Sequence, residues 1–155
     1  MIKNKYLSLF LLILITFTAS AISSFTTSSF KEPWYSGITL PSFNPPSWVF
    51  APVWTILYFM MSVAIWKIWI NTFDLKILKF YFIHLFFNCT WSIVFFGFHQ
   101  INLALINLLI ILIFIIFLMK AYFKLDKISY YLMIPYMAWT FYAFILNFSI
   151  AILNY

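Results

Sequence analysis

Polar and aromatic side chains recur at helical spacing inside three long apolar segments of the chain. The steps of three and four residues place the members of each stripe on one face of a helix. The three stripes are His84, Asn88, Trp91 and Phe95; Tyr136, Trp139, Ala143, Asn147 and Ile150; and Trp54, Tyr58, Met61 and Ile65. Because polar groups are costly in hydrocarbon unless they are paired, we expect all three stripes to point into a helix bundle.

An interior lined by Trp, Tyr and Asn suits the binding of a large, flat, apolar ligand. Aromatic rings supply stacking area, while indole N–H and side-chain amide groups fix the orientation of the ligand. The alternative is that the Asn and Trp side chains only hold the helices together by interhelical hydrogen bonds. The stripes by themselves are compatible with both interpretations.

Conventional catalytic and metal-binding patterns are absent from the sequence. The three acidic residues, Glu32, Asp74 and Asp126, lie outside the apolar segments, so proton-coupled export, which usually needs an intramembrane carboxylate, is disfavoured. His84 and His99 could ligate a haem iron in principle, but a single membrane His is more often a hydrogen-bonded packing residue. We therefore expect no metal site and no cofactor, and an enzymatic activity would lack a conventional catalytic motif.

The composition identifies the elements that must position these side chains. Of the 155 residues, 66% are hydrophobic and only 8% are charged, whereas soluble domains average ~25% charged residues. The chain is therefore an integral membrane protein, and a helical span needs ~20 apolar residues. We predict one all-α domain, 1–155, with five transmembrane helices at about 6–25, 46–70, 77–97, 102–123 and 128–153.

Lysine placement predicts how the bundle sits in the membrane. Eight of the nine lysines fall on the side of the N-terminus, and Lys31 falls on the other. The eight are Lys3, Lys5, Lys67, Lys76, Lys79, Lys120, Lys124 and Lys127. Since cytoplasmic loops are enriched in Lys, we predict a multi-pass protein with a cytoplasmic N-terminus and a C-terminus on the opposite side. Topology thus explains the net charge of +6, and a nucleic-acid partner is not expected.

The first apolar segment has two interpretations. Lys3 and Lys5 followed by an apolar run and Ala19-Ser20-Ala21 resemble a cleavable signal peptide. The run continues to Phe25, however, and is long enough to span the bilayer, so we favour a retained helix.

Proline positions predict a lid and two kinks. The connection 26–45 should resist helix formation, and we expect it to form a lid over a pocket rather than a plain connector. Pro46 suits the first turn of the second span. Pro52 and Pro135 lie inside spans, where they can kink the helices and open space between them. Trp66 and Trp69 are interpreted as interfacial anchors.

Four blocks of residues resemble the translocator protein family, also called tryptophan-rich sensory protein or TspO/MBR. The resemblance extends from about residue 34 to residue 147. The blocks are Trp34–Gly37 with Leu40-Pro41 and Asn44–Phe50; Pro52–Tyr58; Asn88 with Trp91-Ser92 and Phe95–Gly97; and Pro135–Trp139 with Ala143 and Leu146-Asn147.

The resemblance implies a five-helix bundle whose first loop covers an internal pocket. It implies binding of porphyrins such as protoporphyrin IX, of sterols in some members, and of benzodiazepine-type ligands. Some bacterial members degrade protoporphyrin IX in light through pocket Trp residues, so Trp54 and Trp139 would be catalytic if this chain does the same. The ligand-binding residues would be Trp34, Pro45, Pro46, Phe50, Trp54, Tyr58, His84, Asn88, Trp91, Trp139, Ala143, Leu146 and Asn147.

Several positions depart from the family pattern. Leu40-Pro41-Ser42-Phe43 lacks a cation and an indole that many members carry in the lid. Phe148 and Ile152 replace the Tyr and Arg of the sterol motif, which makes a sterol partner doubtful. Lys79 and Ile83 replace small residues on a face that pairs two subunits in some members. A homodimer stays open, but this face does not favour it.

Three functions remain after these exclusions. We favour a membrane receptor or transport-type protein that binds tetrapyrroles, such as protoporphyrin IX or haem, with a sensing or transport role. The alternative is a slow enzyme that degrades protoporphyrin IX with light and oxygen. A structural subunit with an unused pocket is the third. The residues argue for a pocket more than for turnover.

Overall fold

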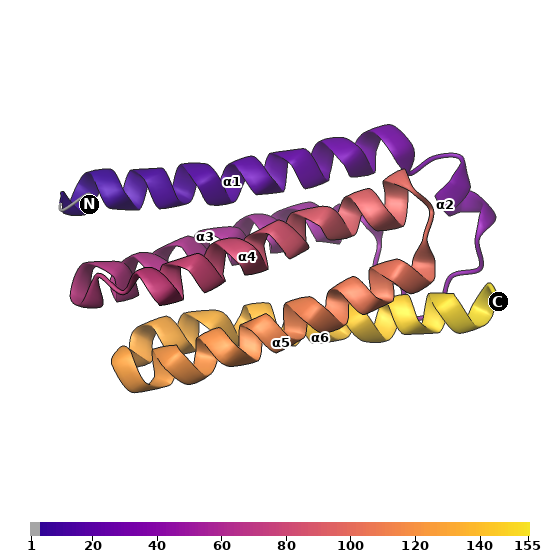
Figure 1. Ribbon diagram of the computed structural model, residues 1–155. Helices are drawn as coiled ribbons and strands as arrows, with labels where there is room; N and C mark the ends of the chain where they lie inside the picture. Colours follow the sequence, from indigo (N-terminus) through magenta and orange to yellow (C-terminus); the bar gives the residue numbers. More distant parts are fainter. Residues whose placement is uncertain (1–3) are drawn as a thin grey trace.

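Five long helices dominate the structure, a computed structural model that describes residues 4–155 (Figure 1). Each is long and apolar enough to cross a membrane, and residues 4–155 contain no strand. The predicted five-helix membrane fold is thus confirmed. The elements are α1 (Lys5–Phe30), the short α2 (Trp34–Gly37), α3 (Ser47–Thr72), α4 (Leu75–Ser92) with its π-helical continuation η1 (Ile93–Gly97), α5 (Ile101–Leu125) and α6 (Lys127–Leu153).

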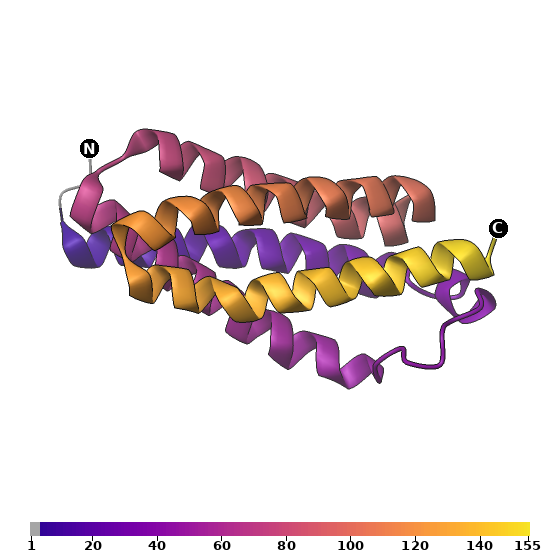
Figure 2. The same ribbon diagram turned by 90° about the horizontal axis from the view of Figure 1, so that it is seen from below.

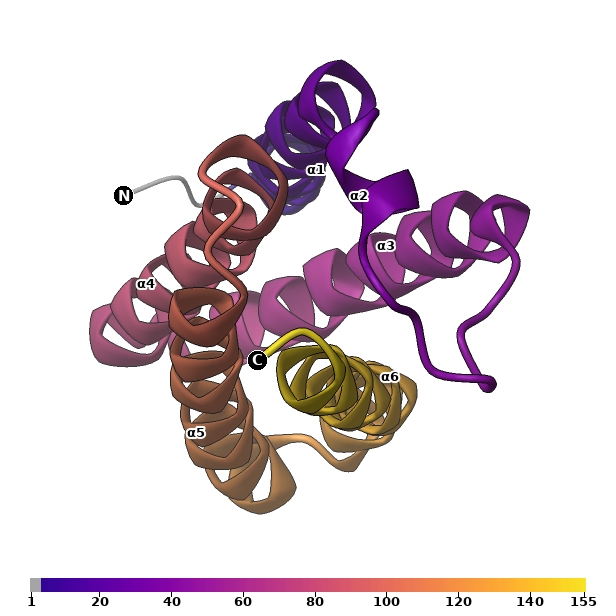
Figure 3. The same ribbon diagram turned by 90° about the vertical axis from the view of Figure 1, so that its right-hand side faces the viewer.

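The five long helices form a closed ring. Contacts join α1 to α3, α3 to α6, α6 to α5, α5 to α4 and α4 back to α1. The view along the bundle shows this order, with α3 running obliquely past its neighbours (Figure 3). Each helix buries one face against the ring and leaves the other toward lipid. In α3, α4 and α6 the predicted stripes contribute to the buried faces, with Tyr58, Asn88, Tyr136 and Asn147 among the buried residues.

Helix boundaries follow local capping chemistry. Asp74 accepts hydrogen bonds from the N–H groups of Lys76 and Ile77, and Asp126 accepts one from Ser129. Carboxylates at these positions satisfy N–H groups that have no partner inside the helix. Pro46 lies just before α3, with extended ψ of 141°. The expectation that it occupies the first helical turn was therefore wrong by one residue.

The connection after α1 is shorter and more helical than predicted. α1 continues to Phe30, and α2 forms a further turn, so much of 26–45 is helix. The side chains of Thr26 and Thr27 donate to the carbonyl oxygens of Ile22 and Ser23, at 3.0 and 2.9 Å. Because these hydroxyls bond within the helix, the polar run extends α1 instead of ending it. We call residues 31–46 the lid segment below.

The start of α1 and the end of α6 lie at opposite ends of the bundle (Figure 1), as an odd number of spans requires. Which end is cytoplasmic stays a prediction, and Lys3 lies outside the described residues. At the N-terminal end, Lys67 lies 3.7 Å from the Asp126 carboxylate. Burial would raise the pKa of Asp126. The hydrogen bonds from Ser129 and the charge of Lys67 outweigh burial and hold this pKa below its ordinary value.

Helix α1 packs closely into the bundle. Thr16 lies within hydrogen-bond distance of the Tyr81 hydroxyl, at 2.7 Å, and the Trp66 indole donates to the Lys5 carbonyl oxygen at 3.0 Å. Retention of this helix stays a prediction. The structure corrects one interpretation, because Trp69 is only 6% exposed. Trp69 is therefore a core residue and not an interfacial anchor.

Candidate ligand-binding site

Aromatic rings from α3 and α6 face each other in the lid half of the bundle. The ring centroid of Trp54 lies 5.5 Å from that of Tyr58 on the same helix and 6.3 Å from that of Tyr136, which it meets edge to face. The ring distances below are likewise between centroids. One turn nearer the lid, Phe50 makes an edge contact with Trp139 at 6.0 Å. We call these five residues the aromatic wall. Such rings offer both faces and edges to a flat apolar ligand.

A buried hydrogen-bond chain braces this wall against α4. The Tyr58 hydroxyl donates to Asn88 Oδ1, and Asn88 Nδ2 donates to the Tyr136 hydroxyl at 2.8 Å. The same hydroxyl lies 2.7 Å from His84 Nε2. All four residues are buried, and in this low-dielectric setting satisfied networks fix side-chain positions. The chain therefore holds three helices in register.

A second chain lies closer to the lid end. The Trp91 indole donates to Asn147 Oδ1 at 3.3 Å, and Asn147 Nδ2 donates to the Ile101 carbonyl oxygen at 3.0 Å. Trp91 also stacks on Phe95 at 5.1 Å. This chain ties α4 to α6 and to the first turn of α5.

Trp139 differs from Trp91 in the state of its indole N–H. Trp139 Nε1 is buried, yet it has no hydrogen-bond partner within residues 4–155, and the adjacent Thr140 hydroxyl is in the same state. His84 Nδ1 and the Tyr122 hydroxyl are the other such atoms in the described part of the chain. A buried polar group without a partner costs about 1–3 kcal/mol. Trp139 thus offers the aromatic wall an uncommitted hydrogen-bond donor.

The lid segment is held to the rest of the bundle at three residues, Thr39, Phe43 and Trp34. The Asn154 side chain pairs with the backbone of Thr39 through two hydrogen bonds, of 2.8 and 2.9 Å. The Tyr142 hydroxyl donates to the Phe43 carbonyl oxygen at 2.7 Å. Within the segment, Tyr35 donates to Asn44 Oδ1 at 3.3 Å. Burial raises the pKa of the Tyr35 hydroxyl, although this hydrogen bond opposes the rise, so Tyr35 stays a neutral donor.

Trp34 provides the third fastening, on the turn between η1 and α5. Its ring stacks on His99 at 4.5 Å and makes an edge contact with Phe95 at 5.3 Å. His99 has φ of 57°, an uncommon backbone conformation for a residue other than Gly. That backbone carries its ring beneath Trp34.

The predicted ligand-binding residues fall into two neighbouring groups. Phe50, Trp54, Tyr58, His84, Asn88 and Trp139 lie in or behind the aromatic wall. Trp34, Trp91, Leu146 and Asn147 gather with Phe95 toward the lid. Ala143 lies between the groups on α6 and is half-buried, while Pro45 is half-buried and Pro46 exposed in the connection to α3.

Sequence reasoning missed three residues that position these groups. Tyr142 and Asn154 fasten the lid, and no local pattern distinguishes them from other polar residues near a helix end. Asn107 had a clearer signal, as an amide within a strongly apolar span. With its amide oriented to suit its neighbours, Asn107 donates to the Phe87 carbonyl oxygen at 3.2 Å and accepts from the backbone N–H of Trp91 at 3.1 Å. It braces α4 where α4 passes into η1.

A groove runs along the lipid side of the aromatic wall, between α3 and α6. Its volume is about 470 Å³, within the range of roughly 300–1,000 Å³ typical of small-molecule sites. The lining residues are Val53, Ile56, Leu57, Met60, Pro135, Ala138, Trp139 and Tyr142. Trp139 therefore lines the groove and also contacts the half-buried ring of Phe50.

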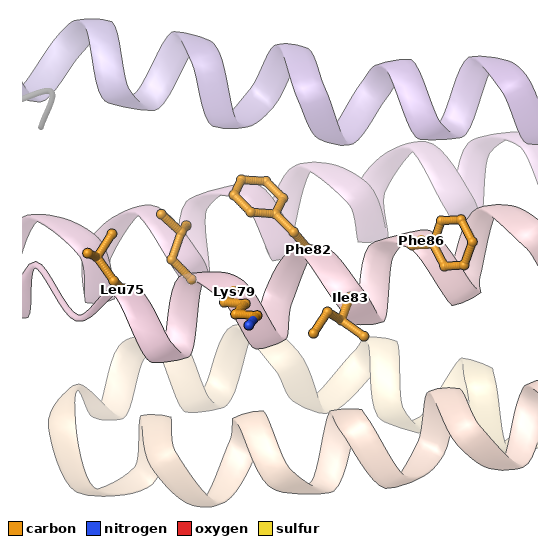
Figure 4. A pocket seen from close by; sticks show the side chains of 6 residues that line it. Leu75, Lys79, Phe82, Ile83 and Phe86 are labelled. Carbon is orange, nitrogen blue, oxygen red and sulfur yellow. The ribbon is translucent and has the colours of Figure 1, made fainter.

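A second hollow lies on the outer face of α4 and is remote from these groups. Lys79 and Ile83, the residues that disfavour the dimer face, line it together with Leu75, Phe82 and Phe86 (Figure 4). One helix alone supplies the lining. The hollow is thus a shallow feature of a lipid-facing surface.

Comparison with known proteins identifies the family. The profile of the TspO/MBR family matches residues 10–153. The chain belongs to the TspO/MBR family. It is 35% identical to the tryptophan-rich protein TspO of Archaeoglobus fulgidus, over 84% of this chain and 86% of the relative. It is 36% identical to the tryptophan-rich sensory protein of Cereibacter sphaeroides, over 91% and 90%, and 32% identical to the human translocator protein, over 76% and 72%.

Family membership confirms the recognition made from the four sequence blocks. It supports a multi-pass membrane protein of receptor or transport type, in keeping with the sensory and translocator names of its relatives. For this TspO/MBR chain, the lipid bilayer is the surrounding medium, and the wall and groove lie within the helices that span it.

Proposed function

We propose that this protein binds tetrapyrroles, such as protoporphyrin IX or haem, against the aromatic wall, and uses this binding for sensing or transport. The observation that carries the proposal is the uncommitted indole N–H of Trp139. A donor left without a partner among apolar rings is costly to the empty protein. A ligand acceptor would satisfy it.

The aromatic wall also suits the shape of a tetrapyrrole. Trp54 and Tyr136 approach edge to face, and so do Phe50 and Trp139. A flat macrocycle that stacks on such rings gains ~0.5–1.5 kcal/mol per ring beyond the area it buries. The two hydrogen-bond chains hold the wall from behind, so the rings need little reorganisation when the ligand arrives.

Titration of the purified protein with protoporphyrin IX tests this function. Trp54 and Trp139 should lose fluorescence on binding, and saturation at one ligand per chain is expected. Trp54→Phe and Trp139→Phe should each weaken binding, whereas Trp48→Phe is the matched control because Trp48 is 74% exposed at the start of α3. Equal affinity in all three variants would argue against the aromatic wall as the site.

Slow degradation of protoporphyrin IX with light and oxygen is the second candidate function. It is favoured by the position of two oxidisable indoles, Trp54 and Trp139, in the same wall. A defined bilin-like product formed over repeated turnovers would support an enzyme. Mixed bleaching that consumes the two indoles, and that dark controls lack, would support a passive binder.

A further inference from the structure

The groove between α3 and α6 opens toward lipid rather than toward water. Its rim residue Ile56 is 59% exposed on the membrane-facing side of α3, and Ala138 and Pro135 are exposed on α6. Every lining side chain except Tyr142 is apolar or, like Trp139, mainly so. A molecule dissolved in the bilayer can therefore occupy this groove without losing contact with hydrocarbon.

The seam between α3 and α6 is fastened at the end away from the lid. There the Ser129 hydroxyl lies 2.9 Å from the Ala64 carbonyl oxygen, and Lys67 pairs with Asp126. In the lid half, the two helices meet through ring contacts such as Phe50 with Trp139. Toward the lid, α3 diverges from α6 (Figure 2).

Both helices carry a proline beside the groove. Pro52 lies inside α3 and Pro135 inside α6. Each proline lacks an N–H and leaves the carbonyl one turn earlier without its helical bond, which loosens the helix there. The seam is thus pinned at one end and most easily separated at the other.

The alternative way in, past the lid, is held closed by direct bonds. Thr39 is joined to Asn154 by two hydrogen bonds, and Phe43 to Tyr142 by a third. A ligand arriving from water would have to break these bonds. A ligand arriving through the groove would separate the Trp139 ring from Phe50, a ring contact without a hydrogen bond, and would pass the Tyr142 ring that also lines the groove.

We infer that the α3–α6 groove is the access route by which a flat, membrane-dissolved ligand reaches the aromatic wall, with the Trp139 ring as the movable partition. The inference rests on the proposed tetrapyrrole function and names the route to that site. The Trp139 ring lines the groove and also contacts Phe50, so its displacement would expose its buried, uncommitted N–H to the incoming ligand.

Filling the groove tests the route. Ala138→Phe places a ring in the groove from an exposed position, and Ile56→Trp does the same from α3. Ala21→Phe is the matched control, because Ala21 is exposed on the lipid face of α1, outside the groove. Protoporphyrin IX is loaded into lipid vesicles, mixed with protein in vesicles, and followed by tryptophan quenching in dim light.

A blocked route changes rates and not affinity. Ala138→Phe and Ile56→Trp should each slow binding and release by about tenfold, which corresponds to about 1.4 kcal/mol added to the barrier. The dissociation constant should stay within about twofold, since both rates change together. The Ala21→Phe rates should match the unaltered protein. A loss of affinity without slower binding would overturn the inference, because the groove would then belong to the bound site.

Locking the lid tests the competing route. In a Cys89→Ser background, Thr39→Cys and Asn154→Cys can be joined by a short bifunctional thiol reagent, with the unlinked double variant as control. Linking should leave the binding rate unchanged. Slower binding after linking, with Ala138→Phe at the normal rate, would overturn the inference. If the unaltered protein does not bind protoporphyrin IX at all, the proposed function itself fails, which is a separate result.

Discussion

Replacing Trp139 by Phe should lower ligand affinity without destabilising the fold. The phenyl ring keeps most of the contact with Phe50 but removes the indole N–H, which is buried without a partner. The lost apolar area costs about 1 kcal/mol, and removal of the unsatisfied donor returns about 1–3 kcal/mol. The free energy of unfolding should therefore be unchanged or rise by up to about 2 kcal/mol.

Trp91→Phe is the matched comparison, since the same chemical change breaks a bond there. The Trp91 indole donates to Asn147 Oδ1, so its removal leaves a buried amide oxygen without a partner. Adding that penalty to the lost area predicts a decrease of about 2–4 kcal/mol in the free energy of unfolding. The two substitutions should thus separate in stability, although both shorten an indole to a phenyl ring.

The assay combines unfolding in mixed detergent micelles with titration by protoporphyrin IX. Trp139→Phe should weaken binding by up to about tenfold, because it removes one hydrogen bond of about 0.5–1.5 kcal/mol. Light-driven bleaching should fall further, since the oxidisable indole is gone. If Trp139→Phe is as destabilised as Trp91→Phe and binds porphyrin normally, the indole N–H is not held free for a ligand, and the reasoning is refuted.

Three further predictions concern the ends of the bundle. Asp126→Ala should lower the free energy of unfolding by about 1 kcal/mol at neutral pH. Because the folded pKa of Asp126 is lowered, this difference should shrink as the pH falls through 3.8 and below, in unfolding measured at pH 7 and pH 3. Asn154→Ala should speed hydrogen exchange at Thr39 by up to about tenfold, through the loss of two bonds, and unchanged exchange would mean that the lid is held elsewhere. Reporter fusions at the two ends should report opposite compartments, with the N-terminus cytoplasmic, and a shared compartment would contradict five spans.

The spans and their inward faces were predictable because a bilayer imposes simple rules. Apolar length fixed each span to within a few residues, except at the end of α1. Helical spacing found the buried faces of His84, Asn88 and Tyr136, since few partners exist for polar groups in hydrocarbon. The same rules wrongly made Trp69 an interfacial anchor. Its proximity to Lys67 indicates its depth in the membrane but not which side of the helix faces the bundle.

A lid was expected, but its bounds, its fastening and the groove could not be predicted, since they depend on how the helices cross. The hydroxyls of Thr26 and Thr27 donate to backbone carbonyl oxygens one turn earlier, and α1 continues through them. Such residues can equally form a turn, and the sequence does not decide between the two. Asn154 reaches Thr39 across 115 residues of chain, which no local pattern indicates. The groove exists because α3 runs obliquely to α6, and the crossing angle is set by packing around the whole ring.

We expect different members of the three stripes to serve helix packing and ligand binding. Two groups of polar side chains are hydrogen-bonded among themselves: Tyr58, Asn88, Tyr136 and His84 in one, and Trp91 and Asn147 in the other. These groups connect the helices without a ligand. Trp139 lies on the same stripe as Tyr136, one turn away, with its donor uncommitted. Substitutions in the two hydrogen-bonded groups should therefore lower stability first and affinity as a consequence. At Trp139 the order should be reversed, and that reversal distinguishes a binding surface from a packing surface within one helix face.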